Sequence, residues 1–186
     1  LNLYLDSTAM MPCNPSIGGT GKGHLVFEVD ALGGEMGVAA DKVTLQSRTL
    51  NLGKGPAVHS KRVQVDRYLY RQIIKQTLED TPNLCLVQAE IVDIKTEPAG
   101  NGKKRVTEII TALGTVWKVQ AVVIAVGTFL DSHIVVGEKF IPSGPDGMLP
   151  SKGLTTSLMR EGVSFMRFKT GTPPRVHADT IDFSQL

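Results

Sequence analysis

The sequence predicts a mixed α/β domain with an open sheet of the nucleotide-binding kind. Strand-like and helix-like segments alternate over the first half of the chain, and a β-meander pattern follows them. The meander leads into a continuous apolar run at residues 121–126, which ends at Gly127-Thr128. Such a run is typical of a strand buried on both faces of a parallel sheet, and ligands of these sheets bind beyond the carboxyl ends of the strands.

The composition fits one globular domain. The chain has 186 residues, of which 41% are hydrophobic and 20% are charged, and this length suits one core of ordinary size. The 20 lysines and arginines against 18 acids leave a net charge of +2. This charge is too small to indicate nucleic-acid binding unless the cations are locally clustered.

The chain carries no sign of a membrane segment or a secretory signal. Its apolar runs are far shorter than the roughly 20 residues of a membrane-spanning helix. The two cysteines, Cys13 and Cys85, are too sparse for a secreted disulfide scaffold. We therefore expect a cytoplasmic protein without membrane contact. Because the first residue is Leu1 and residues 1–5 read as a strand already begun, we also expect a piece of a longer chain.

The first elements are predicted to be a strand, a glycine-containing loop and a helix. Leucines alternate with other residues over residues 1–5, and prolines and glycines punctuate residues 10–19. A helix is predicted to start near residues 19–22 and to stop at Gly33-Gly34. Its apolar face comprises Leu25, Val26, Val29 and Leu32.

The later elements follow from changes in hydrophobic period. Residues 41–63 read as irregular, because glycines and a proline at 51–56 interrupt any long helix or strand. Apolar positions three to five residues apart predict an amphipathic helix at residues 66–79. The remaining predicted elements are strands at 84–88, 90–96, 105–111 and 116–126, a short helix near 155–161, and a loop at 169–175.

The loop at residues 13–23 is the first candidate site. It follows a predicted strand and opens a predicted helix, so its amides and the helix dipole are suited to hold a phosphate or to polarise a ring carbonyl. An ordinary capped helix is the alternative. The glycines and Lys22 do not form a Walker motif, because the four-residue spacing and the hydroxyl residue after the lysine are missing.

Within this loop, Cys13 is the main candidate for a catalytic residue. Nucleophilic cysteines often lie near the start of a helix and near basic residues, which favour the thiolate. Here a predicted helix start, Lys22 and His24 follow Cys13 in the sequence. A packed, inert cysteine is the alternative. Cys85, between apolar neighbours, reads as a small core residue.

Four separated blocks resemble the bacterial MnmG (GidA) family, the flavoprotein half of the tRNA wobble-uridine 5-carboxymethylaminomethyl modification system. The first block is M-P-C-N-P-S-I-G-G-T-G-K-G-H-L-V-F-E-V-D-A-L-G-G at residues 11–34. The others are L-N-L-G-K-G-P-A-V at 50–58 with Arg62, Gln64, Asp66 and Arg67, then V-G-T-F-L at 126–130, and K-T-G-T-P-P-R at 169–175 with T-I-D-F-S at 180–184. They are in family order and span nearly the whole chain.

The resemblance implies an FAD/NAD(P)-binding Rossmann-like domain of the glutathione-reductase-like type. We expect residues 1–130 to be part of the FAD-binding domain, without its first strand and GxGxxG loop. Residues 131–186 are then expected to continue into an inserted substrate- or nucleotide-binding region. The chain is thus expected to be a domain fragment with a β-meander and the start of an inserted domain, roughly the second quarter of the enzyme.

The resemblance also implies a reaction. Family members use FAD, with NADH and methylenetetrahydrofolate as cosubstrates, to add an aminomethyl or carboxymethylaminomethyl group at C5 of the tRNA wobble uridine. Their implied partners are tRNA, the GTPase MnmE and a second copy of the chain. A related folate- and FAD-dependent tRNA uracil-5-methyltransferase is one alternative. An inactive, binding-only fragment is another, because the pyrophosphate loop is missing.

Site residues follow from the resemblance position by position. Cys13 is the implied catalytic residue, and no metal ligand is implied. The implied cofactor-binding residues are Asn14, Gly18, Gly19, Ile91, Gly127, Thr128 and Ser151. The implied tRNA-binding residues are Arg62, Arg67, Lys169 and Arg175. From spacing alone, two alternatives to tRNA phosphate contacts stay open for these cations. They can form a solvent-exposed face, or they can contact FAD phosphates or reduced nicotinamide. At Asp6, a ribose contact and a solvated turn both remain open.

Overall fold

The computed structural model describes residues 1–171 and 176–185. Its α-helices are α1 (Gly23–Ala31), α2 (Glu35–Lys42), α3 (Arg67–Glu79) and α4 (Leu154–Arg160). Its strands are β1 (Ser16–Gly18), β2 (Thr44–Leu50), β3 (Ser60–Val65), β4 (Ile91–Gly100), β5 (Lys103–Thr111), β6 (Val116–Lys118), β7 (His133–Val136) and β8 (Lys139–Pro142). Short 3-10 helices lie at Leu5–Ser7, Pro56–Val58, Pro145–Gly147, Ala178–Thr180 and Phe183–Gln185. The predicted mixed α/β class is confirmed, and none of the described helices is long and apolar enough to cross a bilayer.

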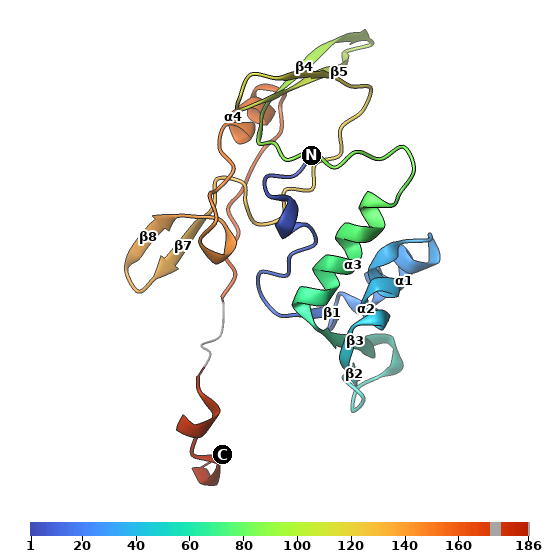
Figure 1. The fold of residues 1–186 in the computed structure, drawn as a ribbon, viewed down its shortest axis with the longest axis vertical. Helices are drawn as coiled ribbons and strands as arrows, with labels where there is room; N and C mark the ends of the chain where they lie inside the picture. Colours follow the sequence, from blue (N-terminus) through green and yellow to red (C-terminus); the bar gives the residue numbers. More distant parts are fainter. Residues whose placement is uncertain (172–175, 186) are drawn as a thin grey trace.

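The first sheet has the strand order β1-β3-β2, and both pairings are antiparallel. Figure 1 shows α1, α2 and α3 gathered beside this sheet. The buried core here is small and comprises Met11, Ala39, Ala40, Val43, Val65 and Tyr70. Ala39 is 0% exposed, and its helix α2 contacts α1, α3 and β1. A methyl side chain at this position allows the elements to approach closely.

Helix α3 confirms the amphipathic helix predicted at residues 66–79. Asp66 has an extended backbone and caps the helix, because its carboxylate accepts hydrogen bonds from the amides of Tyr68 (2.9 Å) and Leu69 (3.0 Å). These amides have no partner within the helix, so the cap satisfies donors that would otherwise lack one. Tyr70 of the same helix is buried in the core of the first sheet.

A second sheet forms the predicted β-meander. Strands β4, β5 and β6 pair in that order, and all pairings are antiparallel. Helix α4, predicted near residues 155–161, packs on β4. The buried residues between them are Ile94, Ile109, Leu154 and Leu158. This core lies apart in sequence from the core of the first sheet.

A polar network fastens α4 to β4. The Ser157 hydroxyl accepts from the Ile94 amide (2.9 Å) and donates to the Asp93 carboxylate (2.6 Å). Lys95 and Arg160 also contact this carboxylate. Hydrogen bonds from Lys95, and then from Ser157, hold the pKa of Asp93 well below its usual range despite partial burial.

The apolar run at residues 121–126 is not a strand, and this prediction was wrong. Val123 is 92% exposed, and no strand among the described residues pairs with the run. A strand of a parallel sheet needs neighbours on both sides to satisfy its backbone groups and bury its side chains. All described pairings between strands are antiparallel, so the run has no parallel partner strand. Its apolar composition alone is not enough to form a strand.

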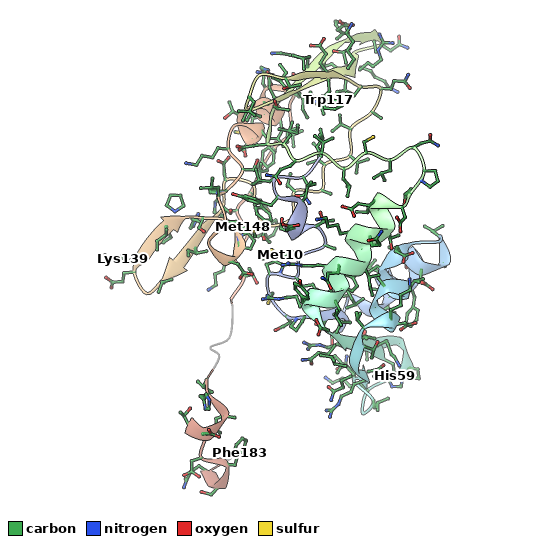
Figure 2. The ribbon with its side chains drawn as sticks, in the orientation of Figure 1. Met10, His59, Trp117, Lys139, Met148 and Phe183 are labelled. Carbon is green, nitrogen blue, oxygen red and sulfur yellow. The ribbon has the colours of Figure 1, made fainter. Side chains whose placement is uncertain are left out.

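Other elements were also mispredicted. Residues 1–5 and 84–88 are not strands and contribute only an isolated bridge between Asn2 and Gln88. The stretch at residues 41–63 is not irregular, because it contains β2 and most of β3. Helix α2 and the hairpin formed by β7 and β8 were not predicted. Figure 2 shows Lys139 beside the turn of this hairpin.

We expect Asp66→Ala to lower the free energy of unfolding by about 1 kcal/mol, because two amides of α3 lose their acceptor. Asp66→Asn is the matched control, since asparagine is also a strong N-cap residue. Urea denaturation followed by circular dichroism measures both variants. Equal losses in the two variants would contradict the capping role.

We expect Asp93→Asn to lower the free energy of unfolding at pH 7 by about 1–2 kcal/mol, because hydrogen bonds to a charged group are lost. The lowered pKa stabilises the fold above the unfolded value of about 4, and this stability is lost as pH falls further. The difference between wild type and variant should therefore shrink below about pH 4. Glu97→Gln, on the exposed part of β4, is the control and should change stability little at either pH.

Candidate functional site

A pocket of about 580 Å³ lies where the loop after Pro12 meets β1, β3 and α1. This volume is within the range of small-molecule sites, about 300–1,000 Å³. Five of the predicted site residues line it: Cys13, Asn14, Gly18, Gly19 and Arg62. The structure therefore brings the candidate catalytic cysteine, part of the predicted cofactor site and one predicted tRNA contact to the same place.

The loop and the start of α1 pack closely against the backbone of β3 beside this pocket. The Gly19 amide donates to the Lys61 carbonyl at 2.8 Å. A Cβ atom at Gly18 would lie 2.3 Å from that carbonyl oxygen, and one at Gly23 would lie 2.9 Å from it. Gly18 also has a φ of +83°, a conformation that side chains other than glycine rarely adopt. Glycine is thus required for the loop and α1 to approach β3 this closely.

Cys13 is a free, half-buried thiol in the wall of the pocket. The loop around it is fixed from two sides, because Arg67 Nη1 donates to the Met11 carbonyl (3.2 Å) and the Val65 amide donates to the Pro15 carbonyl (2.9 Å). The loop does not lead directly into a helix as predicted, since β1 comes between Cys13 and α1. The start of α1 nevertheless borders the same pocket through Lys22.

The lining of this pocket contains both apolar and positively charged side chains. Helix α1, α2 and the end of β2 contribute apolar side chains: Leu25, Val26, Val29, Met36 and Leu50. Lys22 and Arg62 are the charged residues of the lining, and no carboxylate is found among the described lining residues. Such a pocket suits a planar, partly apolar ring that carries or lies beside negative charge.

The other predicted cofactor residues are Ile91, at the start of β4, and Gly127, Thr128 and Ser151, which lie outside the named strands and helices. Ser151 is buried, and its amide donates to the Phe129 carbonyl at 2.9 Å, just after Gly127 and Thr128. Ile91 starts β4 and packs against the core of this sheet. None of these four residues lines the Cys13 pocket.

The remaining predicted cations are scattered. Arg67 is partly buried and lies 3.9 Å from Asp146, in addition to its bond with the Cys13 loop. Lys169 is exposed. Arg175 lies outside the described residues. Asp6 pairs with Lys75 at 2.8 Å, and the hydrogen bond from Lys75 lowers the pKa of Asp6.

The sequence interpretation missed part of the pocket and misplaced one cysteine. Cys85 is exposed in a segment without regular structure, so its prediction as a core residue was wrong. Leu50 and Met36 were missed because they come from elements that were not predicted. No group of three or more metal-ligating side chains occurs within residues 1–171 and 176–185.

The fold matches solved structures, which give its class. The structure of Aquifex aeolicus GidA in the form I crystal matches with a TM-score of 0.86 and 45% sequence identity. This match covers 97% of the present chain and 29% of that chain. The chain is therefore of the Rossmann-like, FAD-binding α/β class that GidA represents.

The chain belongs to the family described as glucose inhibited division protein A (GIDA), whose model matches residues 1–186. Two curated relatives carry the name tRNA uridine 5-carboxymethylaminomethyl modification enzyme MnmG. The protein of Caldicellulosiruptor saccharolyticus is 54% identical over 99% of this chain, and that of Alkaliphilus metalliredigens is 50% identical over 100% of it. The chain spans 29% of the length of each of these relatives.

We expect Gly18→Ala to destabilise the protein more than Gly21→Ala. Both glycines have positive φ, but a Cβ atom meets the Lys61 carbonyl only at Gly18, whereas nothing lies within 4 Å at Gly21. The strained backbone costs about 1–2 kcal/mol at either position, and the clash adds about 1–3 kcal/mol at Gly18 alone. Thermal unfolding of the two variants measures this difference. Equal midpoints would show that the close approach to β3 is not a constraint.

Proposed function

We propose that this chain is part of an FAD-dependent enzyme that modifies the wobble uridine of tRNA. The modification is an aminomethyl or carboxymethylaminomethyl group at C5, added in complex with the GTPase MnmE. The observation that carries this proposal is the Cys13 thiol in the wall of a pocket with one apolar side and no lining carboxylate. The names of the relatives support the same reaction.

The pocket residues fit a planar ring system with an electron-rich edge. The apolar side chains of α1 offer one face for a ring, and Lys22 and Arg62 offer positive charge at its edge. At Gly19, the nearest atom to an added Cβ would be Arg62 Cδ at 4.0 Å. No side chain covers the backbone there, so a ligand can approach it closely, although the Gly19 amide itself is bonded to the Lys61 carbonyl.

Within this proposal, Cys13 is the catalytic residue and contacts the uracil ring. Arg67 and Val65 hold the loop backbone on either side of Cys13, which restrains where the thiol can lie relative to the pocket. FAD, when bound, supplies the redox chemistry that transfers the one-carbon unit of methylenetetrahydrofolate, with NADH as reductant. Asn14, Gly18 and Gly19 would contact the cofactor from the Cys13 pocket, and Ile91, Gly127, Thr128 and Ser151 would contact it from outside that pocket lining.

The proposal includes the wider organisation of the protein. Arg62, Arg67, Lys169 and Arg175 would contact tRNA phosphates, and two copies of the chain would form a homodimer in the cytoplasm. Residues 1–130 would belong to the FAD-binding domain and residues 131–186 to an inserted region. Arg67 would then serve twice, because it also holds the Cys13 loop through the Met11 carbonyl.

We expect Cys13→Ser in the complete enzyme to abolish formation of the modified nucleoside while FAD occupancy is largely retained. The exchange removes the sulfur nucleophile with little change of volume. Cys85→Ser is the matched control, since Cys85 is exposed and is not part of the pocket lining, and it should retain modification. Mass spectrometry of digested tRNA measures the product, and flavin absorbance after desalting measures occupancy. Normal product from the Cys13 variant would remove its catalytic role.

A further inference from the structure

Two arginines stand directly opposite each other beside the Cys13 pocket. Arg48 of β2 and Arg62 of β3 are register partners in an antiparallel pair. Directly opposed residues of such a pair project from the same face of the sheet, with Cβ atoms about 4.5–5.5 Å apart. Because Arg62 lines the pocket, Arg48 extends the positive charge of that lining along the sheet face. Sequence reasoning did not select Arg48.

No carboxylate balances these two charges nearby in the sheet. Strands β1, β2 and β3 contain Arg48, Lys61 and Arg62 but neither aspartate nor glutamate. The sequence from residue 42 to residue 65, and that from residue 7 to residue 27, also lack both acids. Within the described parts of the chain, neither arginine side chain forms a salt bridge of 4.0 Å or less or a hydrogen bond.

An opposed pair of like charges without a counter-ion is unfavourable for the fold. Cross-strand pairs of like charge destabilise a sheet, whereas opposite charges stabilise it. A bound anion reverses the sign of this interaction. Guanidinium groups present several N–H donors in a fixed plane and are particularly suited to the oxygens of a phosphate.

We propose that Arg48 and Arg62 together bind one phosphate group beside the Cys13 pocket. This inference rests on the proposed function and deepens it, because it assigns a phosphate-binding pair to the same site. Two sources of phosphate suit the site: the backbone of the tRNA segment that brings its uridine to Cys13, and the phosphates of FAD.

Lys61 provides a matched control within the same strand. It is adjacent to Arg62 but is paired with Thr49, so its side chain belongs to the opposite face of the sheet. Lys61 is exposed and is not part of the pocket lining. Replacing Lys61 removes the same charge from the same strand without removing it from the proposed site.

The experiment measures tRNA affinity of the FAD-loaded complete enzyme against salt concentration. We expect Arg48→Gln to weaken binding about five- to tenfold near 0.1 M salt, and to reduce the slope of log affinity against log salt by about one. Lys61→Gln should leave the slope unchanged. Because both arginines bind the same phosphate, the Arg48→Gln and Arg62→Gln effects should be less than additive in the double variant.

Thermal unfolding supplies a readout that a merely structural arginine would not give. Without tRNA and at low salt, Arg48→Gln should raise the unfolding midpoint, since it relieves the repulsion with Arg62. A lowered midpoint together with an unchanged salt slope would assign Arg48 to packing of its side chain and overturn the proposal.

Flavin occupancy distinguishes the two sources of phosphate. Loss of FAD from Arg48→Gln and Arg62→Gln on desalting, with an unchanged tRNA slope in reloaded enzyme, would support the pair and assign its phosphate to the cofactor. Unchanged occupancy and slope in an enzyme that modifies tRNA normally would overturn the pair and leave the proposed function standing. A wild-type enzyme that neither binds nor modifies tRNA would overturn the proposed function and the tRNA assignment of this pair together.

Discussion

The carbonyl group of Lys61 is the point at which the loop, β1 and the first helix converge. It accepts the Gly19 amide and lies closer to Gly18 and Gly23 than any side chain would permit. This contact places the beginning of α1 over β3 and leaves the pocket between them. The Lys61 carbonyl is one of several contacts that position the Cys13 loop. Val65 and Arg67 also bond to the backbone of this loop. Pocket geometry is thus determined mainly by backbone contacts, and side chains provide its chemistry.

Different interactions stabilise the interiors of the two three-stranded sheets. Near the pocket, small residues of α2 and a capped α3 pack around a modest apolar core. Between the meander and α4, four buried aliphatic residues are supplemented by the network of Asp93, Ser157 and Arg160. The network is partly buried, so its hydrogen bonds are less screened than those of surface ion pairs. Loss of the Asp93 carboxylate therefore acts directly on the meander, whereas the described lining of the pocket contains no carboxylate.

Local signals predicted the elements that local interactions stabilise. The helix at residues 66–79 carries both an amphipathic period and its own cap at Asp66, and the meander carries alternation and turns. Residues 121–126 were mispredicted because a buried parallel strand depends on neighbours distant in the sequence. Strands β2 and β3 were missed because the turn residues at 51–56 concealed a hairpin. The loop at residues 13–23 was selected from its own pattern, and the resemblance then implied the catalytic role of Cys13. The opposition of Arg48 and Arg62 depends on strand register, which no local motif encodes.

The apolar segment at residues 121–126 has a consequence for handling the protein. Its sequence, A-V-V-I-A-V, contains neither charge nor proline, and Val123 is 92% exposed. Short segments of this composition with unpaired backbone groups readily add to strands of other molecules, and stacked copies form dry interfaces between sheets. Aggregation would therefore start here before it starts at the basic strands β2 and β3, whose charges repel a second copy.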